Sequence, residues 1–329
     1  MPTASAAPLP LVSLIIPAYN EEGNLPLVYE RVTAVETLLA GRCRLEMIIL
    51  DNCSTDRTRE LALEFCHRSP RWKYLRYSRN FGAEASLLAG LDHAGGDAVI
   101  TLFSDLQDPP EMIPRMIEIW SQGAEVVYGI VEERNDSSLL KTLGAKIGYR
   151  MINTLTDCKI PINATDFRLL DQRVVQTLRT LREPDRFMRG LVHWVGYRRE
   201  SFLYNRAERM HGKTNANLIY CVKLTLHAIV CFSAKPMHFA VIFGLVTTFL
   251  AGLLSCTYVV LYFVRPAFLT PPPPGLTTLL LISLLTLGLN SLFLGIIGEY
   301  VGRIYNQGKG RPIYIVAEKR NLSGEAPAA

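Results

Sequence analysis

The hydrophobic positions in about the first 130 residues form short runs that alternate with segments of helical periodicity. The apolar runs predict strands over residues 11–16, 45–50, 72–77, 98–103 and 125–128. Between them, residues 25–39, 56–67, 83–93 and 110–121 are predicted to form helices. Several of the strands are continuous apolar runs, which is typical of strands that are covered on both faces. The alternation of strands and helices therefore predicts an α/β domain with a mostly parallel sheet.

The last third of the chain has a different hydrophobic pattern. No Asp, Glu, Lys or Arg lies between Lys235 and Arg265, and none lies between Arg265 and Glu299. A helix needs about 20 apolar residues to cross the hydrocarbon core of a bilayer. Four prolines at 271–274 separate the two uncharged stretches and cannot continue a helix. The pattern predicts two antiparallel transmembrane helices, over residues 236–265 and 276–299, joined by a Pro-rich loop over 266–275.

The basic residues near the predicted spans indicate their orientation. The short connection between the spans holds only Arg265, whereas the flanks carry Lys223, Lys235, Arg303, Lys309, Arg311, Lys319 and Arg320. Because cytoplasmic flanks are enriched in Lys and Arg, we expect both termini in the cytoplasm and the Pro-rich loop outside. Residues 1–212 would then form a cytoplasmic domain at the inner membrane and residues 300–329 a cytoplasmic tail. Residues 213–235 would form juxtamembrane helices, which either lie along the membrane surface or pack as ordinary helices.

Composition and charge exclude several classes of protein. The chain has 329 residues, of which 49% are hydrophobic, so a fully disordered protein is excluded. The net charge of +5 is only weakly basic and does not indicate a nucleic-acid partner. The seven cysteines include no CxxC pair, which favours reduced thiols over a disulfide framework or a zinc site.

Acids and amides follow each of the first four predicted strands. The segments are Pro17-Ala18-Tyr19-Asn20-Glu21-Glu22, Asp51-Asn52-Cys53-Ser54-Thr55-Asp56, Ser78-Arg79-Asn80-Phe81-Gly82 and Ser104-Asp105-Leu106-Gln107-Asp108-Pro109-Pro110-Glu111. In a parallel sheet these segments start at one edge, where ligands of such folds bind. Carboxylate and amide oxygens suit a hard divalent cation, Mg²⁺ or Mn²⁺, which commonly bridges ligand phosphates.

These segments resemble the motifs of family 2 glycosyltransferases, which have the inverting GT-A (Rossmann-like) fold. The resemblance extends to the polyprenyl-phosphate glycosyltransferases, the bacterial relatives of dolichol-phosphate mannose synthase, and runs from about Val12 to Ile315. Four further segments carry it: residues 165–171 (TDFRLLD), 206–214 (RAERMHGKT), 295–305 (GIIGEYVGRIY) and 311–314 (RPIY).

The resemblance implies roles for particular residues. The donor nucleotide would be held by Pro17, Tyr19, Glu22, Asp51, Asn80 and Ser104. Asp105 and Gln107 would bind the metal that bridges the donor diphosphate, and Asp105 and Asp166 would be the catalytic carboxylates. Asp166 would act as general base for the lipid-phosphate acceptor or would orient it. The phosphate groups of acceptor and donor would be bound by Arg186, Arg189, Arg209 and Lys213.

The resemblance also implies a reaction. A single sugar would pass with inversion from a nucleotide-sugar, with UDP as the favoured nucleotide, to a polyprenyl (undecaprenyl) phosphate at the cytoplasmic face of the membrane. Metal and arginines would stabilise the negative charge on the leaving nucleoside diphosphate. A phosphate acceptor is largely ionised at neutral pH, so Asp166 would serve positioning more than proton removal. Family analogy extends to a homo-oligomer, a tetramer.

Three positions depart from the usual family pattern. Phe103 stands where the family has the first Asp of Asp-x-Asp, Asn52 where a second Asp often follows Asp51, and Asn215 where Lys is common. The two lost carboxylates, at Phe103 and Asn52, are compatible with altered donor choice, weaker metal binding or a degraded catalyst, and altered donor choice is favoured because Asp105, Gln107, Asp166 and the arginines are present. Two other functions stay open: a processive polysaccharide synthase, and a catalytically silent membrane scaffold with a glycosyltransferase fold. The synthase normally has Q-x-x-R-W, whereas here Thr180 follows Gln176 and Arg179.

Overall fold

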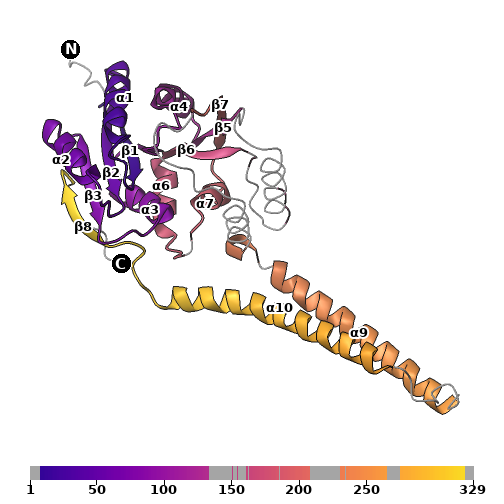
Figure 1. Ribbon diagram of the computed structural model, residues 1–329. Helices are drawn as coiled ribbons and strands as arrows, with labels where there is room; N and C mark the ends of the chain where they lie inside the picture. The colour runs from indigo at the N-terminus through magenta and orange to yellow at the C-terminus, as the bar shows by residue number, and fades with distance from the viewer. Residues whose placement is uncertain are drawn as a thin grey trace. The chain divides into compact units, whose positions relative to one another are not determined.

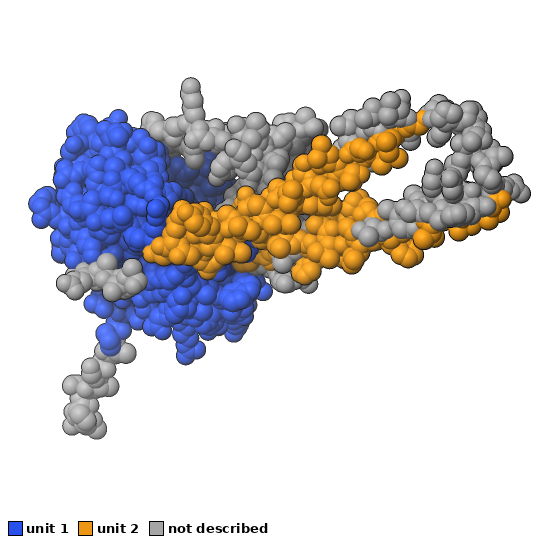
Figure 2. Space-filling view, turned by 90° about the horizontal axis from the view of Figure 1, so that it is seen from below, with its two compact units in different colours: residues 1–231, 311–329 blue, residues 232–310 orange. Residues whose placement is uncertain are grey.

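The computed structural model describes residues 8–132, 150, 154, 161, 163–184, 186–207, 230–233, 235–264 and 275–322. The chain divides into two compact units, which are distinguished by colour in Figure 2. The first unit contains residues 1–231 and 311–329, and the second contains residues 232–310. Arg209 and Lys213, nearly all of the predicted juxtamembrane segment 213–235, and all but the last residue of the predicted loop 266–275 lie outside the described residues.

The first unit is built on one sheet, whose described strands follow the order β7-β5-β6-β4-β1-β2-β3-β8 (Figure 1). Parallel pairing joins β1 to β2 and β4, β2 to β3, and β5 to β7. Antiparallel pairing joins β6 to β4 and β5, and β8 to β3. The strand bounds are Leu11–Ala18 (β1), Arg44–Asp51 (β2), Trp72–Tyr77 (β3), Ala98–Thr101 (β4), Val126–Val131 (β5), Ala164–Asp171 (β6), Arg199–Tyr204 (β7) and Val316–Arg320 (β8). The mostly parallel α/β sheet is therefore confirmed, and so are the five predicted strands, although β4 ends two residues early.

The helices of the first unit lie between these strands, as the alternation predicts. Their bounds are Leu25–Leu38 (α1), Thr58–Arg68 (α2), Ala83–His93 (α3), Ile113–Ser121 (α4), Gln172–Thr180 (α6) and Met188–Trp194 (α7), with a 3₁₀ turn, η1, at Pro110–Met112. Helix α3 lies very close to the sheet. A Cβ atom on Gly90 would come within 2.8 Å of Leu50 and 2.9 Å of Ile15. Only a residue without a side chain permits this approach, so Gly90 fixes α3 against β1 and β2.

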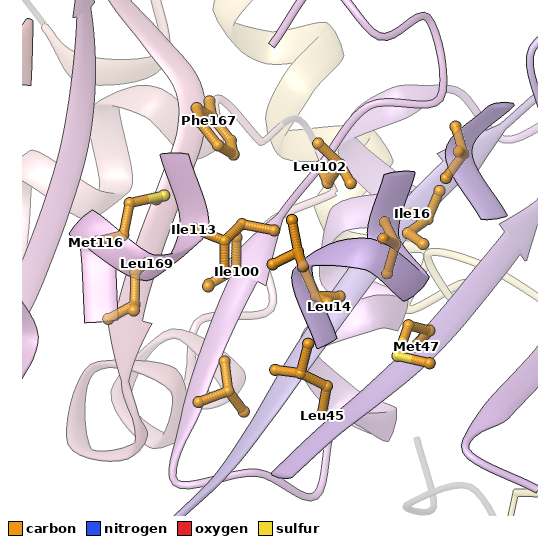
Figure 3. Packing of buried hydrophobic residues seen from close by; sticks show 14 of the residues in the cluster. Leu14, Ile16, Leu45, Met47, Ile100, Leu102, Ile113, Met116, Phe167 and Leu169 are labelled. Atoms are coloured by element: carbon orange, nitrogen blue, oxygen red, sulfur yellow. The ribbon is translucent and has the colours of Figure 1, made fainter. Parts of the chain in front are cut away.

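A cluster of buried hydrophobic residues joins the sheet to the helices on one of its faces (Figure 3). Leu14 of β1, Met47 of β2 and Ile100 of β4 are fully buried, as is Phe167 of β6. Burying a large apolar side chain stabilises a fold by about 1.5–3 kcal/mol. This core holds the carboxyl ends of β1, β2 and β4 in a fixed arrangement.

The residues that follow the second unit return to the sheet of the first. Strand β8 pairs with β3, with Tyr74 opposite Arg320. Glu318 accepts two hydrogen bonds from Arg59, at 2.9 and 3.1 Å. The Tyr314 hydroxyl donates to Asp92 at 2.8 Å. The predicted tail over 300–329 thus contains an edge strand of the sheet of the first unit.

The second unit contains two long helices, α9 (Lys235–Val264) and α10 (Leu276–Gly308), which run side by side (Figure 1). The rings of Phe243 and Phe293 pack with their centroids 5.7 Å apart, and the Tyr300 hydroxyl donates to the Ser233 carbonyl. Within the described part of the chain, we find no helix that is both long enough and apolar enough to cross a membrane. Helices are thus present at both predicted positions, but the structure does not support the prediction that they span a bilayer.

The Asn321 side chain offers a test of how the C-terminal segment is held. Its amide donates to the carbonyls of Cys66 and Trp72, at 3.0 and 2.9 Å, and its φ is +57°. Asn321→Gly removes both hydrogen bonds without straining the backbone, so we expect a loss of about 1–3 kcal/mol in the free energy of unfolding. Urea unfolding followed by tryptophan fluorescence measures this loss. A loss no larger than that of Arg320→Ala, an exposed change on β8, would contradict the account.

Candidate active site

The candidate site lies at the carboxyl ends of β1, β2 and β4. Ala18 is opposite Asp51 in the β1–β2 register, and Ile15 is opposite Thr101 in the β1–β4 register. The loops that leave these three strands therefore begin at one edge of the sheet. Because β6 runs antiparallel to β4 with Thr101 opposite Arg168, Asp166 lies beyond the carboxyl end of β4. The structure thus brings the predicted segments to one edge.

The loops after β1 and β2 are tied to each other by hydrogen bonds. Asn20 has a φ of +55°, and its Oδ1 accepts from the Thr55 backbone N–H at 2.9 Å. The Glu22 N–H donates to Asp56 at 3.0 Å, and the Glu22 carboxylate accepts from the Arg57 N–H at 3.1 Å. Glu22, a predicted nucleotide ligand, therefore holds loop backbone. The neighbouring Tyr19, also predicted, is 47% exposed and has a surface free for contact.

Asp51, at the end of β2, is fully buried and bonded inside the protein. Its Oδ1 accepts from the Ser54 N–H at 2.8 Å, and its Oδ2 accepts from the Tyr74 hydroxyl at 2.7 Å. The Arg76 guanidinium lies 3.8 Å from Oδ2. Burial and the Asp51 carboxylate together raise the pKa of Tyr74, so this phenol stays a hydrogen-bond donor. Asp51 thus fixes the start of the following loop.

Asn52 has a structural role that an aspartate cannot fill. Its amide nitrogen donates to the Gly82 carbonyl at 3.1 Å and to the Ser86 hydroxyl at 2.8 Å. Its Oδ1 accepts from the Phe81 N–H at 3.1 Å. A carboxylate in this place would face the Gly82 carbonyl oxygen without a proton to share. The departure at Asn52 is therefore explained by its contacts with the loop before α3, where the predicted ligand Asn80 accepts from the Gly82 N–H.

The loop after β4 carries the predicted metal ligands. The Ser104 hydroxyl donates to the Pro17 carbonyl at 2.9 Å, which joins this loop to β1 and brings two predicted residues together. Asp105 is 8% exposed, and its Oδ1 accepts from the Gln107 N–H at 3.3 Å. Among the described residues, no group of three His, Cys, Asp or Glu side chains is arranged to hold a metal ion.

Asp108 connects the loop after β4 to the segment that follows β7. Its Oδ1 accepts from the Tyr204 hydroxyl at 2.5 Å and lies 3.2 Å from Nε of Arg206. Its Oδ2 is buried and has no hydrogen-bond partner among the described residues. Burial raises the pKa of Asp108, and the nearby Arg206 opposes that rise. The Ala207 N–H also donates to the Gln107 carbonyl at 3.0 Å. Sequence reasoning listed Asp108 in a motif but missed this network.

Asp166 lies between two guanidinium groups. Arg168 donates to its Oδ1, and Arg189 donates to its Oδ2 at 2.5 Å. Burial by itself would raise the pKa of Asp166, but Arg189 and Arg168 lower it well below the ordinary aspartate value. Asp166 is therefore ionised at neutral pH. Asp166, the predicted base or orienting group for the acceptor, and Arg189, a predicted phosphate ligand, thus form an ion pair.

Glu84, on the first turn of α3, is a carboxylate that sequence reasoning missed. It accepts from the Met188 N–H at 2.9 Å. The burial of its carboxyl group raises the pKa of Glu84 to about 7, and the Asp166 charge adds to the rise. Arg168 and Arg189 act in the opposite direction. No sequence motif singles out Glu84, because its partners come from segments about a hundred residues away.

Arg186, which was predicted to bind phosphate, is buried against the end of α6. It is 2% exposed, and its guanidinium donates to the carbonyls of Leu178 and Leu181 at the end of α6. Cations are favoured at the carboxyl ends of helices, so these contacts cap α6. Of the four predicted phosphate ligands, only Arg189 is placed beside Asp166, and Arg209 and Lys213 lie outside the described residues.

Comparisons with known proteins agree with this arrangement. Residues 13–179 match the family described as Glycosyl transferase family 2. An uncharacterised glycosyltransferase of Bacillus subtilis is 37% identical over 313 residues, which are 95% of each chain. The bactoprenol glucosyl transferase of Shigella phage SfV is 35% identical, and the match covers 94% of this chain and 99% of that protein.

One solved structure with a similar fold is glucosyl-3-phosphoglycerate synthase from Mycobacterium tuberculosis in complex with Mn²⁺, UDP-glucose and phosphoglyceric acid. The TM-score is 0.46 and the identity 16%, over 67% of this chain and 78% of that one.

Proposed function

The chain belongs to glycosyl transferase family 2, and we propose that it transfers a single sugar from a nucleotide-sugar, with UDP as the nucleotide, to a polyprenyl phosphate. The observation that carries the proposal is the contact of Asp166 with Arg168 and Arg189 at the carboxyl edge of the sheet. The relative named bactoprenol glucosyl transferase, whose sequence match covers 94% of this chain, supports the proposal that the acceptor is a polyprenyl phosphate. The tetramer that the resemblance implies stays a prediction.

The donor is proposed to bind over the loops after β1, β2 and β4. Ligands of open α/β sheets bind beyond the carboxyl ends of the strands. The exposed Tyr19 ring offers a surface for the nucleobase, and Asn80 is exposed on the adjoining loop. Asp51, Glu22 and Ser104 hold the backbone of these loops in place. Their contribution is preorganisation, because a rigid site loses less entropy when the donor binds.

The acceptor phosphate is proposed to bind at Arg189. An acceptor oxygen attacks C1 of the sugar, the bond from C1 to the diphosphate oxygen breaks, and that electron pair leaves on the nucleoside diphosphate. A phosphate monoester has a second pKa of about 6, so at neutral pH the attacking oxygen already lacks its proton. A carboxylate with a strongly lowered pKa is also a poor base. Asp166 is therefore an ionised anchor that aims the two guanidinium groups.

A divalent cation, Mg²⁺ or Mn²⁺, is proposed to bind at the loop after β4. Asp105 and Gln107 offer the oxygen ligands that hard cations prefer, and Asp108 adds a buried oxygen that has no hydrogen-bond partner in the part of the chain that the structure describes. These residues fit a cation that takes part of its shell from the donor. When bound, the cation would supply positive charge beside the diphosphate.

The second unit is proposed to hold the enzyme at the cytoplasmic face of the inner membrane, with both termini in the cytoplasm. Large apolar side chains of α9 and α10 are exposed, among them Leu245, Phe249 and Leu294 at 67, 72 and 68%. Patches of this kind mark interaction sites with membranes or proteins. A polyprenyl acceptor stays in the bilayer, so an anchor of two membrane-inserted helices would keep the site close to it.

Transfer itself is the first test. Purified protein with Mg²⁺, polyprenyl phosphate and a panel of UDP-sugars should yield a singly glycosylated lipid phosphate of inverted anomeric configuration. Asp166→Asn should lower kcat by about 100-fold, a magnitude typical of lost charge stabilisation, while donor affinity changes little. Asp171→Asn, at the far end of β6, is the control. No turnover by folded wild-type protein would refute the proposal and favour a silent scaffold, and polymeric products would favour a processive synthase.

Metal dependence is tested at Asp105. Calorimetric titration with a UDP-sugar should show donor binding that EDTA weakens in the wild type. Asp105→Ala should bind the donor weakly with or without EDTA, because the main carboxylate ligand is gone. Glu111→Ala, which changes an exposed carboxylate nearby, should keep the response to EDTA. An Asp105→Ala protein that still loses affinity on adding EDTA would exclude this role.

Membrane insertion is tested by cysteine labelling in intact cells. A cysteine introduced at Thr270 should react with an impermeant maleimide, whereas one at Ala317 should react only after the cells are opened. Alkaline washing should leave the protein in the membrane fraction. Release by alkali, or labelling of Ala317→Cys from outside, would contradict the proposed topology.

A further inference from the structure

The start of helix α7 is held by a side chain from another helix. The first N–H groups of a helix have no partner inside the helix. Phe187, at the N-cap of α7, has no side-chain hydrogen bond to offer, whereas Glu84 of α3 accepts from the Met188 N–H at 2.9 Å. A carboxylate is favoured at this position by the helix dipole. Arg189, the partner of Asp166, is the next residue in α7. Glu84 therefore fixes the backbone from which Arg189 extends.

Helix α3 is itself fixed at its first turn by Asn52. The amide of Asn52, directly after β2, bonds Gly82 and Ser86 and accepts from Phe81. Asn52 is 5% exposed and Ser86 is fully buried, so these bonds are shielded from water. The close approach of Gly90 to Leu50 and Ile15 holds the middle of the same helix. Glu84 thus extends from a helix with little freedom to shift.

The charged groups around Glu84 favour its position beside the start of α7. Its carboxyl group interacts with Asp166 and Arg168 from β6, with Arg189 from α7, and with Arg186 from the segment before α7. The three arginines and Asp166 give these neighbours a net charge of +2. An ionised Glu84 lowers that excess to +1, while a protonated Glu84 still offers its carbonyl oxygen to the Met188 N–H. The backbone contact therefore survives in both protonation states.

We propose that Glu84 is a positioning residue. Together with Asn52, it couples the proposed donor loop after β2 to Arg189, the residue proposed to bind the acceptor phosphate. This inference rests on the proposed function. A sequence of contacts runs from the end of β2 through Asn52, α3 and Glu84 to the first turn of α7. Loss of the Glu84 contact moves Arg189 relative to Asp166 and leaves the loops after β1, β2 and β4 in place. The expected effect is therefore on the acceptor and not on the donor.

The experiment compares two variants of Glu84. Glu84→Ala removes the acceptor of the Met188 N–H, and Glu84→Gln keeps one in a side chain of equal length. We expect Glu84→Ala to raise KM for the polyprenyl phosphate about tenfold, the ordinary effect of one charge-assisted hydrogen bond. Glu84→Gln should restore KM to within about threefold of wild type. Donor affinity, measured by titration with UDP-sugar alone, should stay within about twofold in both.

Asp97→Ala is the matched control. It removes a carboxylate that accepts from a backbone N–H, that of Leu11 at 2.8 Å, at the opposite edge of the sheet. This change should leave KM for the acceptor unaltered. An acceptor KM in Glu84→Ala no higher than in Asp97→Ala would overturn the proposal, as would an equal defect in Glu84→Ala and Glu84→Gln.

The coupling to Asn52 has its own test. Asn52→Asp removes the donor to Gly82 and Ser86, and it should also raise KM for the acceptor. If both residues act through α3, the double variant Asn52→Asp with Glu84→Ala should show less than the product of the single effects. A fully multiplicative double variant would refute the coupling. Wild-type protein without any transfer activity would instead refute the proposed function, so the two failures are distinguishable.

Discussion

The site depends on the contact between the Asp166 carboxylate and the guanidinium groups of Arg168 and Arg189. Two cations with a shared anion form a stable arrangement, whereas two adjacent cations alone would repel each other at a cost of several kcal/mol. The Asp166 charge therefore allows the protein to keep a net positive centre at the edge of the sheet, where a phosphate ligand would bind. The same cations make Asp166 a weak base, which is why its proposed role is to hold and orient.

The rest of the site consists of loops that use polar side chains to hold their own backbone. Asp51 accepts from a backbone N–H of its own loop, Asn52 accepts from a backbone N–H of the loop before α3, and Ser104 donates to a carbonyl near the end of β1. Among the predicted ligands that the structure describes, Tyr19, Glu22 and Asn80 are exposed, and of these the Glu22 carboxylate already accepts from the Arg57 N–H. A set of loops fixed in this way gives a preformed surface, so binding energy is not used to order the chain.

Much of the first unit could be predicted from the sequence, because runs rich in apolar and aromatic residues mark β1 to β5 directly. Strands β6, β7 and β8 have no such signal. Strand β6 carries the buried Arg168, whose charge is balanced by Asp166. Strand β8, with the sequence VAEKR, is a charged edge strand. These segments become strands because they pair with strands that are distant in the sequence, and a local hydrophobic pattern does not reveal that pairing.

Contacts between segments that are distant in the sequence also explain why the roles of some single residues were not predicted. The motifs placed Asp105 and Asp166 at the carboxyl edge of the sheet, where the structure also has them, whereas Arg186, grouped with the phosphate ligands, caps α6. Glu84 was missed because its contact with Met188 joins segments 104 residues apart.

The central claim, that Asp166 is an ionised anchor and not a base, is tested most directly by the pH dependence of kcat/KM for the acceptor. Two acceptors would be compared, a polyprenyl phosphate and the less acidic matching phosphonate. The account predicts that the acid limb moves to higher pH with the phosphonate, and that Asp166→Asn lowers the rate without moving the limb. An acid limb at the same pH for both acceptors, absent from Asp166→Asn, would show that the enzyme's own carboxylate removes a proton and would contradict the account.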